Sequence, residues 1–198
     1  MRDHWWWRPG WRVGRRMYAI HTTFEGQDGL HDLVRAYQEP LRALPGLDII
    51  PLDWLHLTMQ GVGFTDEVDD VETIAKAVQR RLAPINPVDL TFDRPILDPE
   101  APQFRPHPVE GINRVRRAVQ QGIIDVRGEV NESDSWTPHM SIAYSNFDGP
   151  AEPYREALNS AAAAPVTITV RKIKLLVLGR DEHLYRWEIF AGLTLGTL

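Results

Sequence analysis

The sequence contains no cysteine among its 198 residues. This excludes disulfide bonds, thiolate metal ligands and a cysteine nucleophile, and it fits a reducing compartment, so we expect a cytoplasmic protein. No apolar run approaches the roughly 20 residues needed to cross a bilayer. The N-terminal segment MRDHWWWRPGWRVGRR has neither the aliphatic core nor the small-residue cleavage site of a signal peptide. We therefore expect a soluble chain without a membrane partner.

Several motifs for cofactors and metals are also missing. The glycines form no G-x-x-x-x-G-K-[ST] or G-x-G-x-x-G loop, which would cradle a nucleotide phosphate. No H-E-x-x-H or similar spacing occurs, although a metal site needs three or four ligands of fixed geometry. The acidic stretch DEVDD (66–70) is most simply the start of a helix. We expect no metal and no cofactor.

The formal net charge is -5. A field of this sign repels a long polyanion, so duplex DNA is excluded as the expected partner, while a small phosphorylated ligand is allowed. The positive charge is concentrated at the start of the chain. Five arginines and four tryptophans lie within residues 1–16, namely Arg2, Arg8, Arg12, Arg15, Arg16, Trp5, Trp6, Trp7 and Trp11.

We assign residues 1–14 to an N-terminal arm, which has two interpretations. Its tryptophans could stack on bases while its arginines contact phosphate, as in single-stranded nucleic-acid sites. Alternatively, the tryptophans cover an apolar flank of the domain or of a neighbouring subunit, because burying them removes a large apolar area from water. We favour the second interpretation.

The remaining chain alternates strand and helix patterns, and its length suffices for one domain with a real core. Period-2 and β-branched segments predict strands over 15–24, 52–64, 87–97, 102–108, 135–147, 165–179 and 183–193. Helical spacing of apolar residues predicts helices over 28–46, 65–83, 109–123 and 149–164. Pro40 should disturb the first helix, and a Thr/Asp cap should begin the second.

Two of the predicted strands have similar sequences, HLTMQGVGF from His56 and HMSIAYSNF from His139. When His56 is aligned with His139, Thr58 falls on Ser141, and both segments end in phenylalanine. Each segment is followed by a predicted helix and then by a strand that begins Pro-Val. The repeat predicts two related lobes that face each other across a cleft.

We place these lobes at roughly 15–98 and 99–198, within one bilobal domain over 15–198. Residues i and i+2 of a strand share a face about 6.6 Å apart, so His56 lies beside Thr58. His139 lies beside Ser141 in the same way. Each lobe then presents an imidazole and a hydroxyl to the cleft.

This pair of motifs suits the cleavage of a cyclic phosphodiester. The reaction needs a base to deprotonate water or a ribose hydroxyl, an acid to protonate the departing oxygen, and donors for the nonbridging oxygens. Histidine can serve as either acid or base at neutral pH, since its unperturbed pKa is near 6.5. The hydroxyls of Thr58 and Ser141 can donate to the phosphate.

The paired HLT and HMS motifs resemble the 2H phosphoesterase superfamily, which includes bacterial RNA 2',3'-cyclic phosphodiesterases, also called 2'-5' RNA ligases. The layout is similar over 15–195, and specific residues match over 52–64 and 135–147. The resemblance implies an α+β, two-lobed fold with a pseudo-twofold repeat, in which antiparallel sheets line a central cleft and helices lie outside. It also implies metal-independent catalysis.

Carried over to this sequence, the resemblance makes His56 and His139 the acid and the base, with Thr58 and Ser141 binding substrate. The chain departs from many relatives at Met59 and Gln60, where a plainly apolar strand is usual. The N-terminal arm is also no general feature of the superfamily. These departures leave the substrate open.

A third His-x-Thr, His21-Thr22-Thr23, lies on a predicted strand but is not followed by the matching aromatic or Pro-Val strand. We expect His21 either to support the substrate-binding pocket or to be a structural histidine. The other histidines are expected to be solvated, because they fall in arm, helix, loop or turn segments; they are His4, His31, His107 and His183.

The expected function is hydrolysis of 2',3'-cyclic phosphate ends of RNA, or of small cyclic or 2'-5' linked nucleotides, by a monomer. One alternative is 2'-5' RNA ligation, which runs the same acid-base pair backwards. The other is a noncatalytic RNA- or nucleotide-binding module. The partner in each case is a nucleotide or an RNA terminus, which points to RNA processing.

Overall fold

The computed structural model of the chain describes residues 1–130 and 136–196. The helices within these ranges are α1 (Asp28–Arg42), α2 (Val71–Leu82), α3 (Val109–Arg127) and α4 (Glu152–Ser160). The strands are β1 (Met17–Thr23), β2 (Leu47–Ile49), β3 (His56–Phe64), β4 (Val88–Phe92), β5 (Ile96–Leu97), β6 (Pro102–Phe104), β7 (Met140–Ser141), β8 (Ala143–Ser145), β9 (Val166–Val170), β10 (Lys172–Gly179) and β11 (Arg186–Thr194).

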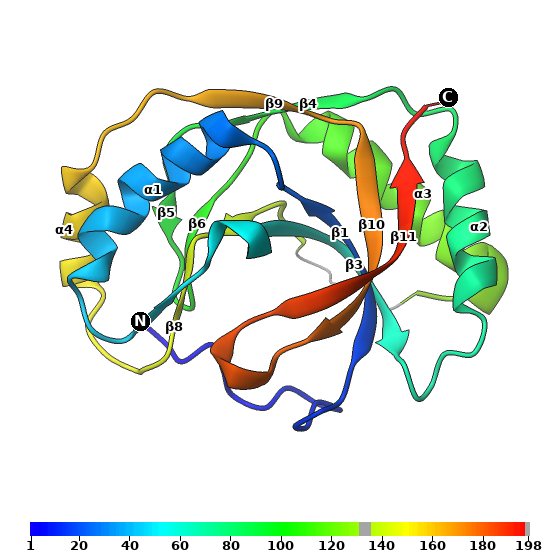
Figure 1. Cartoon of the computed structure of the whole chain (residues 1–198), viewed down its shortest axis with the longest axis horizontal. Helices are drawn as coiled ribbons and strands as arrows, with labels where there is room; N and C mark the ends of the chain where they lie inside the picture. Colours follow the sequence, from blue (N-terminus) through cyan, green and yellow to red (C-terminus); the bar gives the residue numbers. More distant parts are fainter. Residues whose placement is uncertain (131–135, 197–198) are drawn as a thin grey trace.

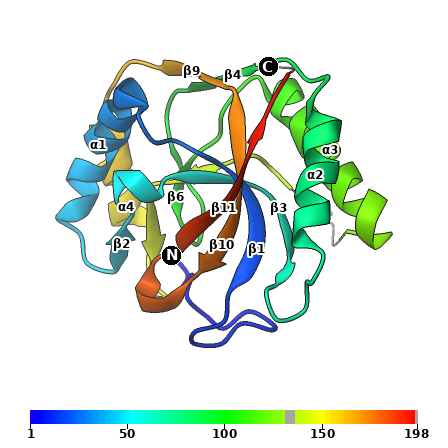
Figure 2. The ribbon, with the colours of Figure 1, turned by 45° about the vertical axis from the view of Figure 1, so that its right-hand side comes forward.

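All strand pairs are antiparallel. The largest sheet has the order β11-β10-β1-β3, and smaller sheets are formed by β5-β6-β7, β2-β8 and β4-β9. Figures 1 and 2 show α1 and α4 on one side of the molecule and α2 and α3 on the opposite side, with the strands between them. The predicted α+β class, with antiparallel sheets inside and helices outside, is confirmed.

The two sides do not correspond to the two halves of the chain. Helix α1, from the first half, contacts α4 and β9, whereas α3, from the second half, contacts α2 and β3. The large sheet likewise pairs β1 and β3 with the late strands β10 and β11. A lobe boundary near residue 98 therefore separates neither the sheets nor the helix pairs.

The helices follow the predicted periodicity, with differences at their ends. In α1 one face is buried, formed by Leu30, Leu33, Val34, Tyr37 and Leu41. The helix continues through Pro40 and ends at Arg42, before the predicted Pro-Gly stop.

Helix α2 starts at Val71 instead of Thr65, so the predicted Thr/Asp cap is wrong. The backbone N–H of Thr65 bonds to the carbonyl of Arg16 instead, and Arg15 pairs with Asp66 at 2.7 Å and with Glu67. Asp66 and Glu67, which precede α2, thus pair with Arg15 next to the N-terminal arm.

Three predicted strands are each divided between two sheets, namely those over 87–97, 135–147 and 165–179. The segment 165–179 changes sheet at Arg171, between β9 and β10, and the segment 87–97 forms β4 and β5. The segment 52–64 begins with a 3-10 turn over Leu52–Trp54 before β3. The segment 135–147 forms only β7 and β8, and its first residue lies outside the described ranges.

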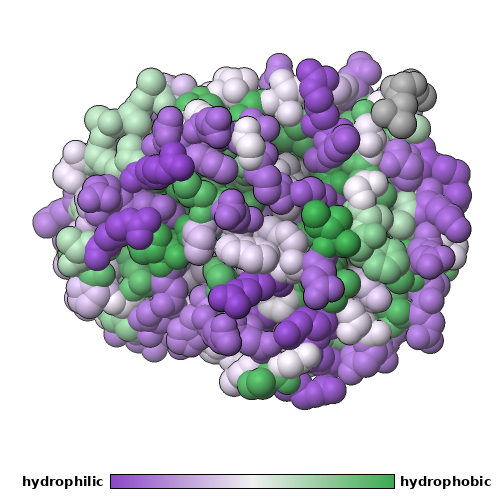
Figure 3. Space-filling view, in the orientation of Figure 1, coloured by the Kyte–Doolittle hydropathy of each residue, from purple (hydrophilic) through white to green (hydrophobic). Residues whose placement is uncertain are grey.

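Apolar side chains from both sides of the molecule form one continuous core. At its centre the Phe92 ring meets the edges of Phe24 and Phe104, with ring centroids 5.6 and 6.1 Å apart. Such close packing holds the sheets in a fixed relation. Hydrophilic side chains predominate on the face drawn in Figure 3. In the described part of the chain, no helix combines the length and apolar character needed to span a membrane.

Candidate active site

A cavity of about 550 Å³ opens between the large sheet and the strands β6, β7 and β8. This volume is within the range of pockets that hold small ligands, about 300–1,000 Å³. All of the residues predicted to form the site line this one cavity: His21, His56, Thr58, His139 and Ser141. Residues more than 80 positions apart in the sequence therefore meet around a single space.

The two paired histidines make the same local hydrogen bond. The Nδ1–H of His56 donates to the carbonyl of Trp54 at 2.9 Å, and the Nδ1–H of His139 donates to the carbonyl of Thr137 at 2.9 Å. Because a carbonyl can only accept, each neutral ring carries its hydrogen on Nδ1. Nε2 of each ring is then unprotonated and able to accept a proton.

His56 is surrounded by aromatic rings. It stacks on His21 with centroids 4.7 Å apart, and it meets the edges of Trp187 and Tyr185 at 5.3 and 5.9 Å. Burial and, to a lesser extent, the charge of His139 lower the pKa of His56 to about 4, against the opposing effect of its bond to Trp54. His56 is therefore neutral at pH 7, whereas His139 lies exposed at the mouth of the pocket.

His21 lies behind the pair. It is opposite Thr58 in the β1–β3 register, and its Nε2 is 3.4 Å from the Thr58 hydroxyl. The side chain is only 1% exposed, and burial, followed by the charge of His56, holds its pKa well below the ordinary value. A neutral His21 thus contacts both Thr58 and the ring of His56.

The two hydroxyls come from different sheets. Thr58 is half-buried on β3, and Ser141 is buried on β7. Trp136 joins the two motifs, because its indole N–H donates to the Thr58 carbonyl at 3.2 Å. It stands three residues before His139, whereas Trp54 stands two residues before His56, so the alignment of the two motifs does not pair the tryptophans and gave no signal for Trp136.

The N-terminal arm lies across one wall of the cavity. His4, Arg8 and Trp11 line the cavity together with Glu100 and Tyr185. None of these five residues was predicted to belong to the site. Their positions depend on contacts between distant segments, which no local pattern reports.

His4 is buried rather than solvated, contrary to the prediction. Its Nδ1–H donates to Glu100 at 3.0 Å, its Nε2 accepts from the Tyr185 hydroxyl at 3.0 Å, and its ring stacks on Tyr144 with centroids 4.1 Å apart. His31 is also buried, and its Nε2–H donates to the Phe24 carbonyl at 2.8 Å. His107 and His183 are exposed, as predicted.

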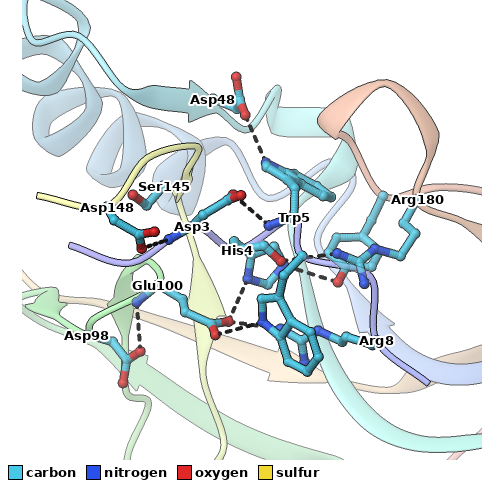
Figure 4. Close-up of polar contacts among 12 residues, drawn as sticks. Asp3, His4, Trp5, Arg8, Asp48, Asp98, Glu100, Ser145, Asp148 and Arg180 are labelled. Carbon is cyan, nitrogen blue, oxygen red and sulfur yellow. Dashed lines mark hydrogen bonds and ion pairs between the residues drawn. The ribbon is translucent and has the colours of Figure 1, made fainter. Parts of the chain in front are cut away.

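The tryptophans of the arm differ in burial, so the interpretation that they cover the domain does not apply to all of them alike. Trp5 is buried in the core, where its indole N–H donates to Asp48 at 2.8 Å, as Figure 4 shows. Trp6 and Trp7 are exposed, and Trp11 is half-buried at the cavity wall. The favoured interpretation, that the tryptophans cover the domain, therefore holds for Trp5.

No cluster of three or more His, Asp or Glu side chains suited to a metal ion occurs in the residues that the structure describes. Two imidazoles with free Nε2 atoms can exchange protons, and two hydroxyls can donate hydrogen bonds to an anionic oxygen.

Solved structures of low sequence identity share the fold. TT0787 of Thermus thermophilus matches with a TM-score of 0.70 at 16% identity, over 93% of this chain and 100% of that chain. LigT of E. coli, crystallised with NADP+, matches with a TM-score of 0.61 at 14% identity, over 92% of this chain and 99% of that chain. The MHV ns2 PDE domain matches with a TM-score of 0.55 at 13% identity, over 83% of this chain and 99% of that chain.

No curated protein matches the sequence significantly. The family model described as the 2'-5' RNA ligase superfamily, however, matches residues 28–182, which include both paired histidines. The likeness to the 2H phosphoesterases that the HLT and HMS motifs indicated is thereby confirmed. The chain belongs to the 2'-5' RNA ligase superfamily, a group of phosphoesterase- and ligase-type enzymes.

Proposed function

We propose that the protein is a metal-independent phosphodiesterase that hydrolyses 2',3'-cyclic phosphate ends of RNA, or small cyclic or 2'-5' linked nucleotides. One observation carries the proposal: His56 and His139 line the same cavity, each beside a hydroxyl residue. Their Nδ1 atoms are both held by backbone carbonyls, so both Nε2 atoms are available for proton transfer. A symmetrical pair of this kind meets the need for one acid and one base.

We assign the base to His56. Its lowered pKa keeps it neutral at pH 7, so it can take a proton but has none to give. Nε2 of His56 removes a proton from water as the water oxygen bonds to phosphorus. The bond between phosphorus and one ribose oxygen breaks, and protonated His139 donates its proton to that oxygen. Thr58 and Ser141 donate hydrogen bonds to the nonbridging oxygens.

His21 is a positioning residue in this scheme. Its side chain is too deeply buried to contact the reacting phosphate, but it contacts the Thr58 hydroxyl and stacks on His56. Such contacts fix the rotamers of the groups that act on the substrate.

The relatives support a nucleotide substrate. Crystal structures of E. coli LigT are complexes with NADP+, 3'-AMP, ATP and phosphate. The match to the MHV ns2 PDE domain supports phosphodiester cleavage, since PDE is part of its name. The cavity of this chain is large enough for a mononucleotide.

Turnover of a 2',3'-cyclic mononucleotide tests the proposal. His56→Ala and His139→Ala should each lower kcat by about 10²–10⁴-fold, since each removes a positioned acid or base. His107→Ala is the matched control, because His107 is exposed and does not line the cavity. A chelator should leave the rate unchanged. Wild-type activity in the His56→Ala/His139→Ala double variant would rule out the mechanism.

The family model that matches the chain also names ligation. In ligation a 5'-hydroxyl would take the place of water: His56 removes the proton of this hydroxyl as its oxygen bonds to phosphorus, and His139 protonates the ribose oxygen whose bond to phosphorus breaks. Incubating cyclic-phosphate RNA with and without a 5'-hydroxyl oligonucleotide separates ligation from hydrolysis. Binding of the nucleotide without any product would favour a noncatalytic module.

A further inference from the structure

The N-terminal arm is fixed to the rest of the protein by buried polar contacts (Figure 4). Arg180, itself only 5% exposed, donates to the carbonyl of His4 at 3.1 Å. The His4 side chain bonds to Glu100 and Tyr185, and Trp5 bonds to Asp48. Buried polar groups that are satisfied in this way specify one conformation. The arm is therefore a permanent wall of the cavity.

Arg8 is the cation that this wall presents. It lines the cavity, and its Nη2 donates to Glu100 at 2.8 Å, so one carboxylate holds both Arg8 and His4. The Nε of Arg8 is buried and has no hydrogen-bond partner among the described residues. The Arg8 side chain as a whole is 37% exposed, so the N–H groups of its guanidinium that face the cavity can donate to an anionic oxygen while Glu100 holds it in place.

A second cation lines the same cavity. Arg105 follows β6, is exposed, and forms no ion pair with any residue in ranges 1–130 and 136–196. The two carboxylates of the cavity are engaged within the protein, since Asp98 accepts from the Glu100 backbone and Glu100 holds Arg8. One carboxylate is thus divided between Arg8 and His4, and Arg105 adds a cation that no carboxylate of the described residues pairs with.

Neither arginine is needed for the reacting phosphate, which Thr58, Ser141 and the histidines can hold. Arg8 nevertheless lines the same cavity as His56 and His139. A substrate that reaches from the histidines to Arg8 would bring a second anionic group there. Trp11, on the same wall, adds an aromatic surface on which a base can stack.

We propose that the N-terminal arm is a substrate-binding element in which Arg8 contacts a second phosphate, on the 5' side of the reacting one. This inference rests on the proposed nucleotide substrate and makes it more specific. The protein then prefers the end of an oligonucleotide to a mononucleotide.

The test compares the binding of two product-like probes by calorimetry, a 3'-phosphorylated dinucleotide and 3'-AMP. The wild type should bind the dinucleotide more tightly. Arg8→Gln should lower the ratio of the two affinities about tenfold, since a charge-assisted hydrogen bond is lost. Arg12→Gln is the matched control, because Arg12 belongs to the same arm but is exposed, pairs with Asp66 and lies outside the cavity. In the Arg12→Gln variant, the ratio of the two affinities should equal that of the wild type.

Arg8→Lys keeps a cation beside Glu100, so it should retain part of the preference for the dinucleotide, whereas a purely structural Arg8 would leave the ratio unchanged in every variant. Thermal melting of each variant shows whether the arm is still attached. An unchanged ratio in folded Arg8→Gln, or equal wild-type affinity for both probes, would overturn the inference. Turnover of a 2',3'-cyclic nucleotide is measured in parallel and is independent of the affinity ratio. If the enzyme turns over but Arg8→Gln leaves the affinity ratio unchanged, only the role of Arg8 is wrong. If Arg8→Gln lowers the affinity ratio but no turnover occurs, only the proposed reaction is wrong.

Discussion

His56 and His139 each donate the same kind of hydrogen bond, from Nδ1 to the backbone carbonyl two residues earlier, but their surroundings differ. His56 is enclosed by His21, Tyr185 and Trp187, and His139 is exposed. Burial disfavours a charged imidazole, so in the mechanism that we propose the surroundings, and not the motif, distinguish the base from the acid. The motifs alone left this assignment open.

The pH dependence of kcat/KM follows from this difference. His56 must be neutral to act as the base, and its pKa is lowered to about 4. Activity should therefore persist as the pH falls through 6.5 and decline only as it approaches about 4, where His56 becomes protonated. Measuring kcat/KM from pH 3.5 to 8 checks this, with circular dichroism to show that the protein stays folded. An acidic limb near pH 6.5 would contradict the assignment of His56.

The helices and strands show where local patterns are sufficient. The alternation of apolar residues supported the correct prediction of β3, where Leu57 and Met59 are buried and Thr58 between them is half-buried, and the β-branched and aromatic content correctly predicted β1. It did not reveal the change of sheet between β9 and β10. The only sign is a pair of consecutive exposed residues, Arg171 and Lys172, which interrupts the alternation. Periodicity reports which face is buried but not which strand is the neighbour.

Helices α2 and α3 cross closely at Gly122. A Cβ atom there would lie 2.6 Å from the Cα and 2.8 Å from the backbone nitrogen of Val78. Alanine would add about 1 kcal/mol of helix propensity, but overpacking against a backbone that cannot rotate away costs about 1–3 kcal/mol. We expect Gly122→Ala to lower the free energy of unfolding by up to about 2 kcal/mol in denaturant titrations.

Gln121→Ala is the control, because this neighbouring side chain is exposed. Its free energy of unfolding should change by no more than about 0.5 kcal/mol. A more stable Gly122→Ala variant would mean that the helices can separate at little cost.

Contacts between distant segments hold the molecule together around the cavity. The N-terminal arm reaches β8, the segment before β6 and the β10–β11 connection, through Trp5, His4 and Arg180. Trp5 packs against Tyr144 and Tyr185 and belongs to the common core. The arm is thus part of the fold.

Trp5→Ala should lower the free energy of unfolding by about 3–5 kcal/mol, as for other large buried aromatics. Trp7→Ala, in the same arm but with a side chain 56% exposed, should change it by no more than about 0.5 kcal/mol. Chemical denaturation of both variants checks the difference. Equal stability of the two would show that the arm does not contribute to the core.

The amino-acid pattern, together with the family resemblance of its two motifs, was enough to predict the α+β class, the helix faces and five residues that line one cavity, namely His21, His56, Thr58, His139 and Ser141. This was possible because strand alternation and a repeated motif are local properties. The burial of His4, the wall formed by the arm, and the packing of α1 with α4 could be seen only in three dimensions. They depend on contacts such as that between His4 and Tyr185, which are 181 residues apart. A contact of this kind stabilises the fold without producing a pattern in the residues around either partner, so the sequence does not predict it.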